Sequence, residues 1–191
     1  MDLKHAVQFY KEERFLCEIV ADFSREGLEK GEAVILVATA RHRREVERRL
    51  NDGGIDVGGL ERSGRLVLLD ARQTLDTFMV GRTPDPELFL AKLQSVMAGA
   101  TGGWQRAARA YGEMVDLLWG DGNQGAAIQL EEIWNSYAKE TSIRVLCGYA
   151  MNNFDDEADP GFARVCELHT DVRPAEGSLQ AAAGSGKKKL G

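Results

Sequence analysis

The sequence has few of the residues that mark specialised classes of protein. Its 191 residues include three cysteines, whose wide spacings form neither a disulfide framework nor a Cys-x-x-Cys metal motif. We expect buried thiols at Cys17 and Cys166. No run of about 18 apolar residues occurs, and the first residues lack the apolar segment of a signal peptide. These absences predict a cytoplasmic protein without a membrane span.

An excess of positive charge is also absent. The formal net charge of −6 argues against direct nucleic-acid binding, which normally needs a basic face to neutralise phosphates. Segment 41–49 is rich in arginine, but the arginines alternate with Glu45 and Glu47 in a helical pattern that indicates a solvated face. The 43% hydrophobic and 28% charged residues fit an ordinary globular domain.

Short β-branched runs alternate with longer amphipathic segments, which predicts an α/β fold with a mainly parallel sheet flanked by helices. We expect strands at 33–38, 65–70, 106–111 and 143–149, and helices at 12–30, 41–51, 84–97, 126–139 and 161–168. Gly31 should end the first helix, and Thr39 should cap the next. Residues 1–172 are predicted to form one domain. Residues 173–191, with Lys187 to Lys189 near their end, read as a disordered low-complexity tail.

Glu113 is the most unusual polar residue of the chain. It follows Gly112 directly after a predicted strand, in mostly apolar sequence, so its carboxylate must be solvated, paired or functional. Open α/β sheets bind ligands at the carboxyl ends of their strands, which favours a binding role. The alternative is a carboxylate that only offsets the dipole of a following helix. If Glu113 lies near His5, the two should pair and form a site.

Six short motifs occur in order along most of the chain. They are His5 to Tyr10, Gly27-Leu28 with Gly31-Glu32, Gly64 to Asp70, Tyr111 to Val115 with Leu118-Trp119, Leu130-Glu131 with Trp134-Asn135, and Leu146 to Tyr149. Together they resemble the MEDS domain, the methanogen/methylotroph sensory domain of bacterial and archaeal signalling proteins. The resemblance implies a non-catalytic sensory module that binds a small organic ligand, often attached to kinase or transcription-regulator domains.

On this basis we expect a ligand site built from aromatic, acidic and histidine side chains: His5, Tyr10, Tyr111, Glu113, Trp119, Glu131, Trp134 and Tyr149. Packing alone is the competing interpretation for the tryptophans and tyrosines. Glu131 and Trp134 are three residues apart and should share one helix face. The partner should be a signalling protein, such as a histidine kinase or transcription regulator, or a second copy in a homodimer.

Two other functions remain open. The order of elements also resembles RecA/KaiC-like ATPases, which have a three-layer architecture, but residues 10–14 lack the glycine-rich phosphate-binding loop. A degenerate nucleotide-binding protein is therefore one alternative, and an enzyme with Glu113 and His5 as acid and base is another. We expect no cofactor. We also expect no metal, because His42 and His169 lie far from His5 in the sequence and would have to converge with it.

Overall fold

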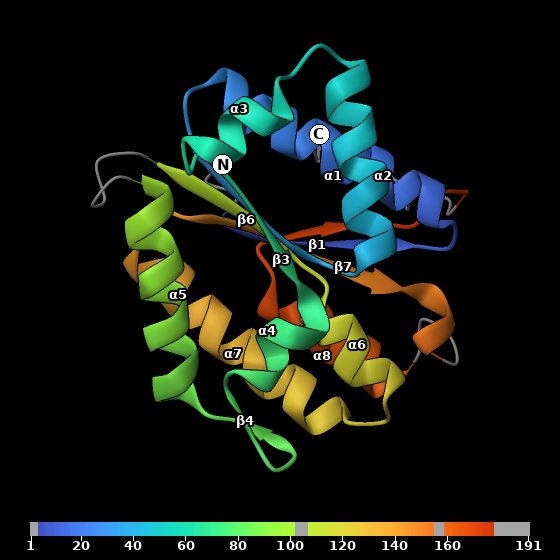
Figure 1. Cartoon of the computed structure of the whole chain (residues 1–191). Helices are drawn as coiled ribbons and strands as arrows, with labels where there is room; N and C mark the ends of the chain where they lie inside the picture. The colour runs from blue at the N-terminus through green and yellow to red at the C-terminus, as the bar shows by residue number, and fades with distance from the viewer. Residues whose placement is uncertain (1–3, 102–106, 155–158, 178–191) are drawn as a thin grey trace, which may run out of the picture.

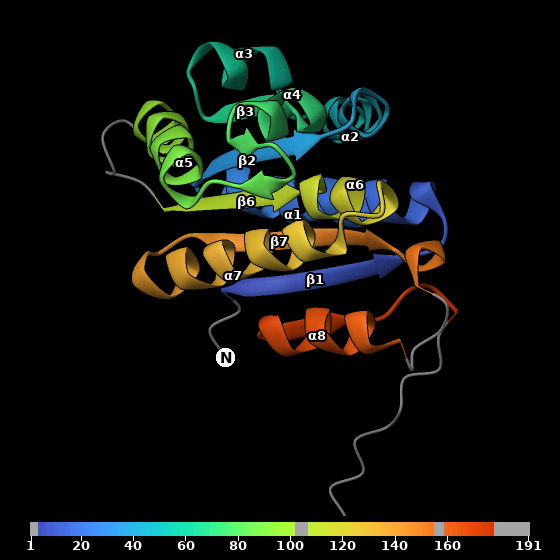
Figure 2. The same cartoon turned by 90° about the horizontal axis from the view of Figure 1, so that it is seen from below.

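The computed structural model describes residues 4–101, 107–154 and 159–177. A parallel six-stranded sheet forms its centre, with strand order β3-β2-β6-β7-β1-β8. Its strands are β1 (His5–Tyr10), β2 (Ala33–Ala38), β3 (Leu66–Asp70), β6 (Ala108–Gly112), β7 (Arg144–Ala150) and β8 (Asp171–Arg173). Figure 2 shows β3, β2, β6, β7 and β1 stacked in this order. The predicted parallel α/β class is confirmed.

Helices cover both faces of the sheet and give a three-layer architecture (Figure 1). On one face lie α1 (Glu13–Glu29), α2 (Ala40–Asp52) and α3 (Val57–Arg62). On the other lie α4 (Ala71–Asp76), α5 (Pro86–Thr101), α6 (Met114–Gly120), α7 (Gln124–Glu140) and α8 (Pro160–Leu168). A small antiparallel hairpin, β4 (Met79–Val80) with β5 (Thr83–Pro84), precedes α5, and a 3-10 helix, η1 (Met151–Asn153), follows β7.

Local sequence explains where the first helices begin and end. The Thr39 side chain accepts a hydrogen bond from the His42 backbone N–H at 3.4 Å, which is the predicted cap of α2. Gly31 follows α1 with a φ of +78°, a conformation that glycine adopts without steric cost. Within α2, the buried residues His42, Val46 and Leu50 recur every four positions and face the sheet.

The glycine-glutamate motifs around α1 have a structural cause. A Cβ at Gly27 would lie 2.5 Å from Nε of Arg109, so only glycine leaves room for this buried side chain. The Arg109 guanidinium donates to Glu32 Oε2 at 2.5 Å and to the Phe23 carbonyl at 2.7 Å. Gly27 and Glu32, from the motif around α1, therefore both contact the buried side chain of Arg109 in β6.

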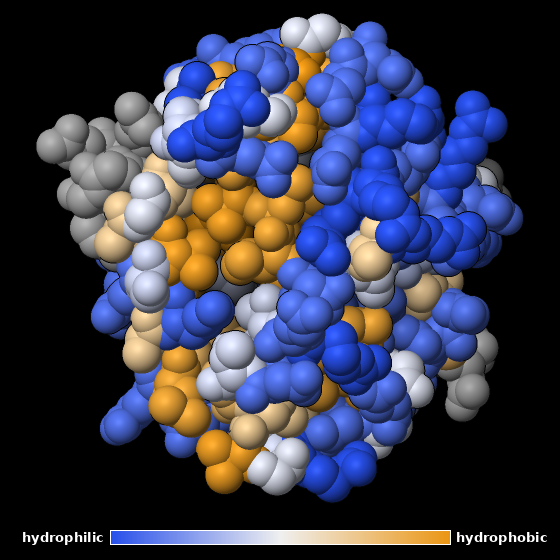
Figure 3. Space-filling view, viewed as in Figure 1, coloured by the Kyte–Doolittle hydropathy of each residue, from blue (hydrophilic) through white to orange (hydrophobic). Residues whose placement is uncertain are grey.

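Successive side chains of each strand point to opposite faces of the sheet, and this divides the hydrophobic core into two parts. In β1, Val7 and Phe9 pack toward α5, α6, α7 and α8, whereas Ala6 and Tyr10 pack toward α1 and α2. Strand β3 forms one edge of the sheet and is only partly covered. Figure 3 shows apolar atoms gathered over this edge, between α3 and α5. Among the described residues, no helix is long and apolar enough to cross a membrane.

The packed region extends past the predicted boundary at Val172. Strand β8 pairs with β1, with Arg173 opposite Gln8. Ala175 is buried, and the Pro174 carbonyl accepts a hydrogen bond from Gln8 Nε2 at 3.1 Å. Residues 173–177 therefore belong to the folded domain, which corrects the expectation that the tail begins at Arg173. The remainder of that predicted tail, residues 178–191, lies outside the described residues.

Candidate functional site

Glu113 is held at the carboxyl ends of two neighbouring strands. It follows β6 as the first residue before α6 and is 2% exposed. Its Oε2 lies 2.6 Å from Nδ1 of His42 and accepts a hydrogen bond from the Tyr111 hydroxyl at 3.1 Å. Its Oε1 accepts a hydrogen bond from the backbone N–H of Thr39. Glu113 is thus paired, and it joins the end of β6 to the start of α2.

This position is a switch point of the sheet. The chain leaves β2 toward α2 on one face and leaves the adjacent β6 toward α6 on the other. Strand ends that diverge in this way leave a crevice, where open α/β sheets commonly bind ligands. The structure therefore places the Glu113 carboxylate where the sequence argument expected it.

Gly148 of β7 explains the position of Tyr111. A Cβ at Gly148 would lie 2.6 Å from the Tyr111 hydroxyl oxygen, so the ring crosses β7 only because this residue has no side chain. Gly148, in the Leu146 to Tyr149 motif, therefore leaves the space that the Tyr111 ring occupies. This space lets the Tyr111 hydroxyl reach Glu113.

A second polar group continues along the same edge. The Tyr10 hydroxyl at the end of β1 donates to Asp116 Oδ2 at 3.1 Å. Asp116 Oδ1 accepts hydrogen bonds from the Ala150 backbone N–H at 2.8 Å and from Asn153 Nδ2 at 2.6 Å. We call His42, Glu113, Tyr111, Tyr10 and Asp116 the edge cluster. It connects the ends of β1, β6 and β7 with α2 and α6.

The surroundings shift the pKa of four members of the edge cluster. Burial and the nearby carboxylates raise the pKa of both Tyr10 and Tyr111, so both phenols stay neutral and donate hydrogen bonds. Burial lowers the pKa of His42, but the hydrogen bond and the negative charge of Glu113 outweigh it and raise the pKa overall. Burial raises the pKa of Asp116, and the hydrogen bond from Ala150 opposes that shift.

A pocket of about 480 Å³ opens beside the edge cluster, between α1 and α2. We call it the edge pocket. Its lining is polar and mainly basic: Glu13, Arg14, Cys17, Arg41, His42, Arg44, Glu45 and Arg48. His42 is the member of the edge cluster that lines it. Burial, with Glu45 and Glu113 nearby, raises the pKa of the Cys17 thiol to about 11, so this lining residue is uncharged at neutral pH.

A second polar cluster lies on the opposite face of the sheet. Nε2 of His5 and Nε2 of His169 lie 3.2 Å and 3.4 Å from Glu131 Oε2. Cys147 Sγ lies 3.4 Å from the same oxygen and 3.5 Å from His5 Nε2. All four side chains are buried, and their potential ligand atoms lie within 4.8 Å of one another. We call these residues the core cluster. They could hold a metal ion.

The structure corrects the expectation that the predicted site residues share one pocket. Tyr10, Tyr111 and Glu113 meet in the edge cluster, but His5 pairs with Glu131 in the core cluster. The partner of Glu113 is His42. The predicted pairing of Glu113 with His5 is therefore wrong. Of the two histidines that would have to converge with His5, His169 does so, with ring centroids 4.1 Å apart, whereas His42 lies in the edge cluster.

The remaining predicted residues pack in the core. Tyr149 lies in the core on the core-cluster face, where burial and the charge of Glu131 raise its pKa, and its ring meets Trp119 at 5.8 Å. Trp119 Nε1 donates to the Asn153 carbonyl at 3.0 Å. Trp134 is buried with Glu131 on α7, as expected for a shared face, but its ring meets Phe89 at 5.1 Å. These contacts are those of packing residues.

Sequence reasoning missed several members of the two clusters. His42 was assigned to a solvated arginine-rich helix, although its spacing with Val46 and Leu50 marks a buried face. His169 was not predicted as a site residue, because it lies far from His5 in the sequence. Cys147 was included only as part of a family motif, and Asp116 was not considered. The odd separation of His5 and Tyr10 along one strand already implies opposite faces of the sheet.

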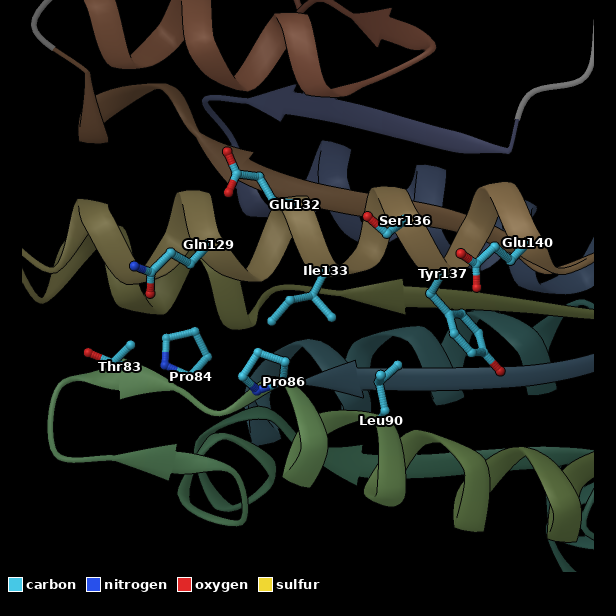
Figure 4. Close-up of a pocket in the computed structure, with 10 residues that line it drawn as sticks. All are labelled: Thr83, Pro84, Pro86, Leu90, Gln129, Glu132, Ile133, Ser136, Tyr137 and Glu140. Carbon is cyan, nitrogen blue, oxygen red and sulfur yellow. The ribbon is translucent and has the colours of Figure 1, made fainter.

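Another hollow, of about 580 Å³, lies between α7 and the segment that runs from β5 into α5. Figure 4 shows Ile133 and Tyr137 of α7 directed toward Pro86 and Leu90. The other lining residues are Thr83, Pro84, Gln129, Glu132, Ser136 and Glu140. We call it the helix groove. Its lining is mainly apolar, and it contains no member of the edge cluster or the core cluster.

Comparisons with known proteins show what the chain is similar to. A search of curated proteins found no match. Among solved structures, the chain is similar to the KaiC-like protein PH0186 from the hyperthermophilic archaeon Pyrococcus horikoshii OT3. The TM-score is 0.57 at 14% sequence identity, over 87% of this chain and 70% of that chain, which supports a KaiC-like fold.

The sequence profile of one family matches residues 4–170. That family is described as MEDS, the MEthanogen/methylotroph, DcmR Sensory domain. The match includes every residue of the edge cluster and the core cluster. The chain therefore belongs to the MEDS family of sensory domains.

Proposed function

We propose that this domain is a non-catalytic sensor that binds a small organic anion in the edge pocket. The observation that carries the proposal is the contact between His42, which lines the pocket, and the buried carboxylate of Glu113. Small-molecule sites combine a cavity of about 300–1,000 Å³ with a few convergent polar groups, and the edge pocket has both.

The charge of the lining favours an anionic ligand. Four arginines and two glutamates line the pocket together with His42. Arg41 is engaged by Glu13 at 2.6 Å, and Arg48 by Glu45 at 2.7 Å. Among the described residues, Arg14 and Arg44 have no ion-pair partner, so both guanidinium groups are available to a carboxylate. Glu113 holds Nδ1 of His42, which leaves Nε2 for the ligand.

The same contacts offer a route from ligand to signal. Glu113 bonds the first backbone N–H before α2 and also precedes α6, so a ligand that moves His42 acts on both helix starts. A shift of the starts of α2 and α6 would change the surface that a partner protein contacts. The partner is a signalling protein, such as a histidine kinase or transcription regulator, or a second copy of this chain. Family membership as a sensory domain supports this role.

Features at the end of β1 argue against nucleotide hydrolysis. Only Lys11 and Glu12 stand between β1 and α1, which is too short for a glycine-rich phosphate-binding loop. The Glu176 carboxylate accepts the backbone N–H of Lys11 at 3.1 Å and also that of Glu12. A carboxylate of the chain itself thus occupies amides that a phosphate would use. A phosphate-release assay with ATP should match the buffer blank, and turnover abolished by His42→Gln would favour an enzyme.

Binding should be tested with a panel of small carboxylic acids by isothermal titration calorimetry. We expect one or more acids to bind, with affinity reduced at least about tenfold in Arg44→Gln and in His42→Gln, since a charged hydrogen bond contributes about 1.5–3 kcal/mol. Ile133→Ala in the helix groove is the matched control and should bind normally. Loss of binding in Ile133→Ala, with normal binding in His42→Gln, would move the ligand site to the helix groove.

A further inference from the structure

The core cluster presents more acceptor atoms than its protons satisfy. Nδ1 of His169 lies 2.7 Å from the Val165 carbonyl, so it carries the proton that this bond requires. In neutral His169 the lone pair of Nε2 then faces Glu131 Oε2 at 3.4 Å, without a hydrogen bond. A second proton on Nε2 would satisfy both atoms as an imidazolium-carboxylate pair, and a metal ion between the two atoms would also satisfy both.

Four of the six separations between the potential ligand atoms are near those of a tetrahedral metal ion. A zinc site with bonds of about 2.0–2.3 Å separates its ligand atoms by roughly 3.3–3.8 Å. The distances from Glu131 Oε2 to His5 Nε2, His169 Nε2 and Cys147 Sγ are 3.2, 3.4 and 3.4 Å. Cys147 Sγ and His5 Nε2 are 3.5 Å apart. The two remaining separations, from His169 Nε2 to His5 Nε2 and to Cys147 Sγ, are at most 4.8 Å.

We propose that His5, Glu131, Cys147 and His169 bind a zinc ion that holds the C-terminal part of the domain to the sheet. Two imidazoles, one thiolate and one carboxylate form a ligand set suited to Zn²⁺. The thiolate and the carboxylate balance the charge of the ion, so the buried site is neutral overall. The Cys147 proton is released to solvent when the metal binds.

The arrangement outside the ligands supports this assignment. Metal-bound histidines usually donate their second ring N–H to a carbonyl or carboxylate; His169 does so to Val165, whereas Nδ1 of His5 has no hydrogen-bond partner among the described residues. The four ligands come from β1, α7, β7 and the residue that follows α8. Metal would therefore tie the segment between α8 and β8 to β1, β7 and α7. The site lies on the opposite face from the edge pocket and is independent of the proposed sensory ligand.

Cobalt substitution of the full chain tests the proposal. The protein is stripped with a chelator, titrated with Co²⁺ and followed by absorption spectroscopy, with metal content measured by mass spectrometry. We expect about one Co²⁺ per chain, visible ligand-field bands of a tetrahedral site, and a near-ultraviolet band from the sulfur-cobalt bond. Zn²⁺ should displace Co²⁺ and raise the melting temperature of the stripped protein.

Two alanine variants locate the site. Cys147→Ala should lose the sulfur-cobalt band, whereas Cys17→Ala, which removes a buried thiol on the other face, should retain it. His169→Gln, which removes a proposed metal ligand, should weaken cobalt binding by more than the roughly tenfold that loss of a partner outside the ligands costs. If Cys147→Ala does not fold, His169→Gln and the wild-type cobalt spectrum decide whether the core cluster binds metal. Folded wild-type protein that takes up no cobalt, or a sulfur band that survives Cys147→Ala, would show an ionic hydrogen-bonded core instead.

Discussion

The carboxylate of Glu113 lies 2.6 Å from Nδ1 of His42, although the two residues are 71 positions apart in the chain. This contact joins a strand end that sequence analysis marked as functional to a histidine that it assigned to a solvated helix. It also separates the edge cluster from His5, which lies on the other face of the sheet with Glu131.

The contact makes stability depend on pH in a defined direction. The folded state raises the pKa of His42 above its ordinary value of 6.5. A raised histidine pKa stabilises the fold fully below about pH 6.5, and this stabilisation is lost as pH rises through the higher folded value. Urea unfolding should therefore show a larger stability difference between wild type and His42→Gln at about pH 5.5 than at about pH 9. His169 is present in both proteins, so its titration cancels. An equal or reversed difference would show that His42 is neutral in the fold.

Gly148 should be required for the position of Tyr111. Alanine there would place a Cβ 2.6 Å from the Tyr111 hydroxyl oxygen, so the buried ring must move. We expect Gly148→Ala to cost about 1–3 kcal/mol of unfolding free energy, and less in a Tyr111→Phe background that lacks the nearest atom. Chemical denaturation of the single and double variants measures both values.

Gly125 is a matched control for this glycine. It is exposed at the start of α7, and a Cβ there would meet no atom within 4 Å. Gly125→Ala should leave stability unchanged or raise it by up to about 1 kcal/mol. A similar loss in Gly125→Ala and Gly148→Ala would mean that the contact with Tyr111 is not the cause.

Two arginines share Glu32 but differ in burial, so they should differ in energetic effect. The side chain of Arg109 is 1% exposed and that of Arg144 is 43% exposed. Removing one partner of a buried ion pair costs about 3–5 kcal/mol, whereas an exposed pair contributes about 0–1 kcal/mol. Arg109→Ala should therefore destabilise the domain far more than Arg144→Ala in the same denaturation assay. Comparable losses would indicate that the Arg109 pair is hydrated in solution.

The end of the folded domain can be located by truncation. Ending the chain after Val172 removes Arg173, buried Ala175, and the Glu176 carboxylate that accepts hydrogen bonds from Lys11 and Glu12. We expect this truncation to lower the melting temperature by several degrees. Ending the chain after Gly177 should leave the melting temperature unchanged, because residues 178–191 have few apolar side chains and three consecutive lysines. Equal melting temperatures would restore the boundary predicted from sequence.

Sequence patterns predicted the long elements well because each has a clear physical signal. The run Ala33–Ala38 is apolar throughout and forms β2, and the amphipathic segment around Glu13–Glu29 forms α1. Strands β1 and β8 and helices α3, α4 and α6 were missed. The three helices are short, and β1 contains His5 and Gln8, whose buried polar side chains obscure an apolar pattern.

The candidate site was predicted only in part, because proximity in space does not follow from motif order. Glu113 and Tyr111 were identified from the end of their strand, and they do meet. His5 and Tyr10 were placed together because they share one motif, yet side chains an odd number of positions apart on a strand face opposite ways. The convergence of His169 with Glu131 depends on how α8 packs, and no local pattern encodes that.

The central claim is that a small organic anion binds beside His42 in the edge pocket. The most direct measurement is nuclear magnetic resonance of protein labelled with ¹⁵N in the histidine rings, titrated with a panel of small carboxylic acids. The three histidines report on two separate places, since His42 lines the edge pocket while His5 and His169 lie in the core cluster. We predict that a binding acid shifts the His42 resonances and leaves those of His5 and His169 unchanged. Binding that leaves His42 unperturbed, or no binding of any acid in the panel, would contradict the account.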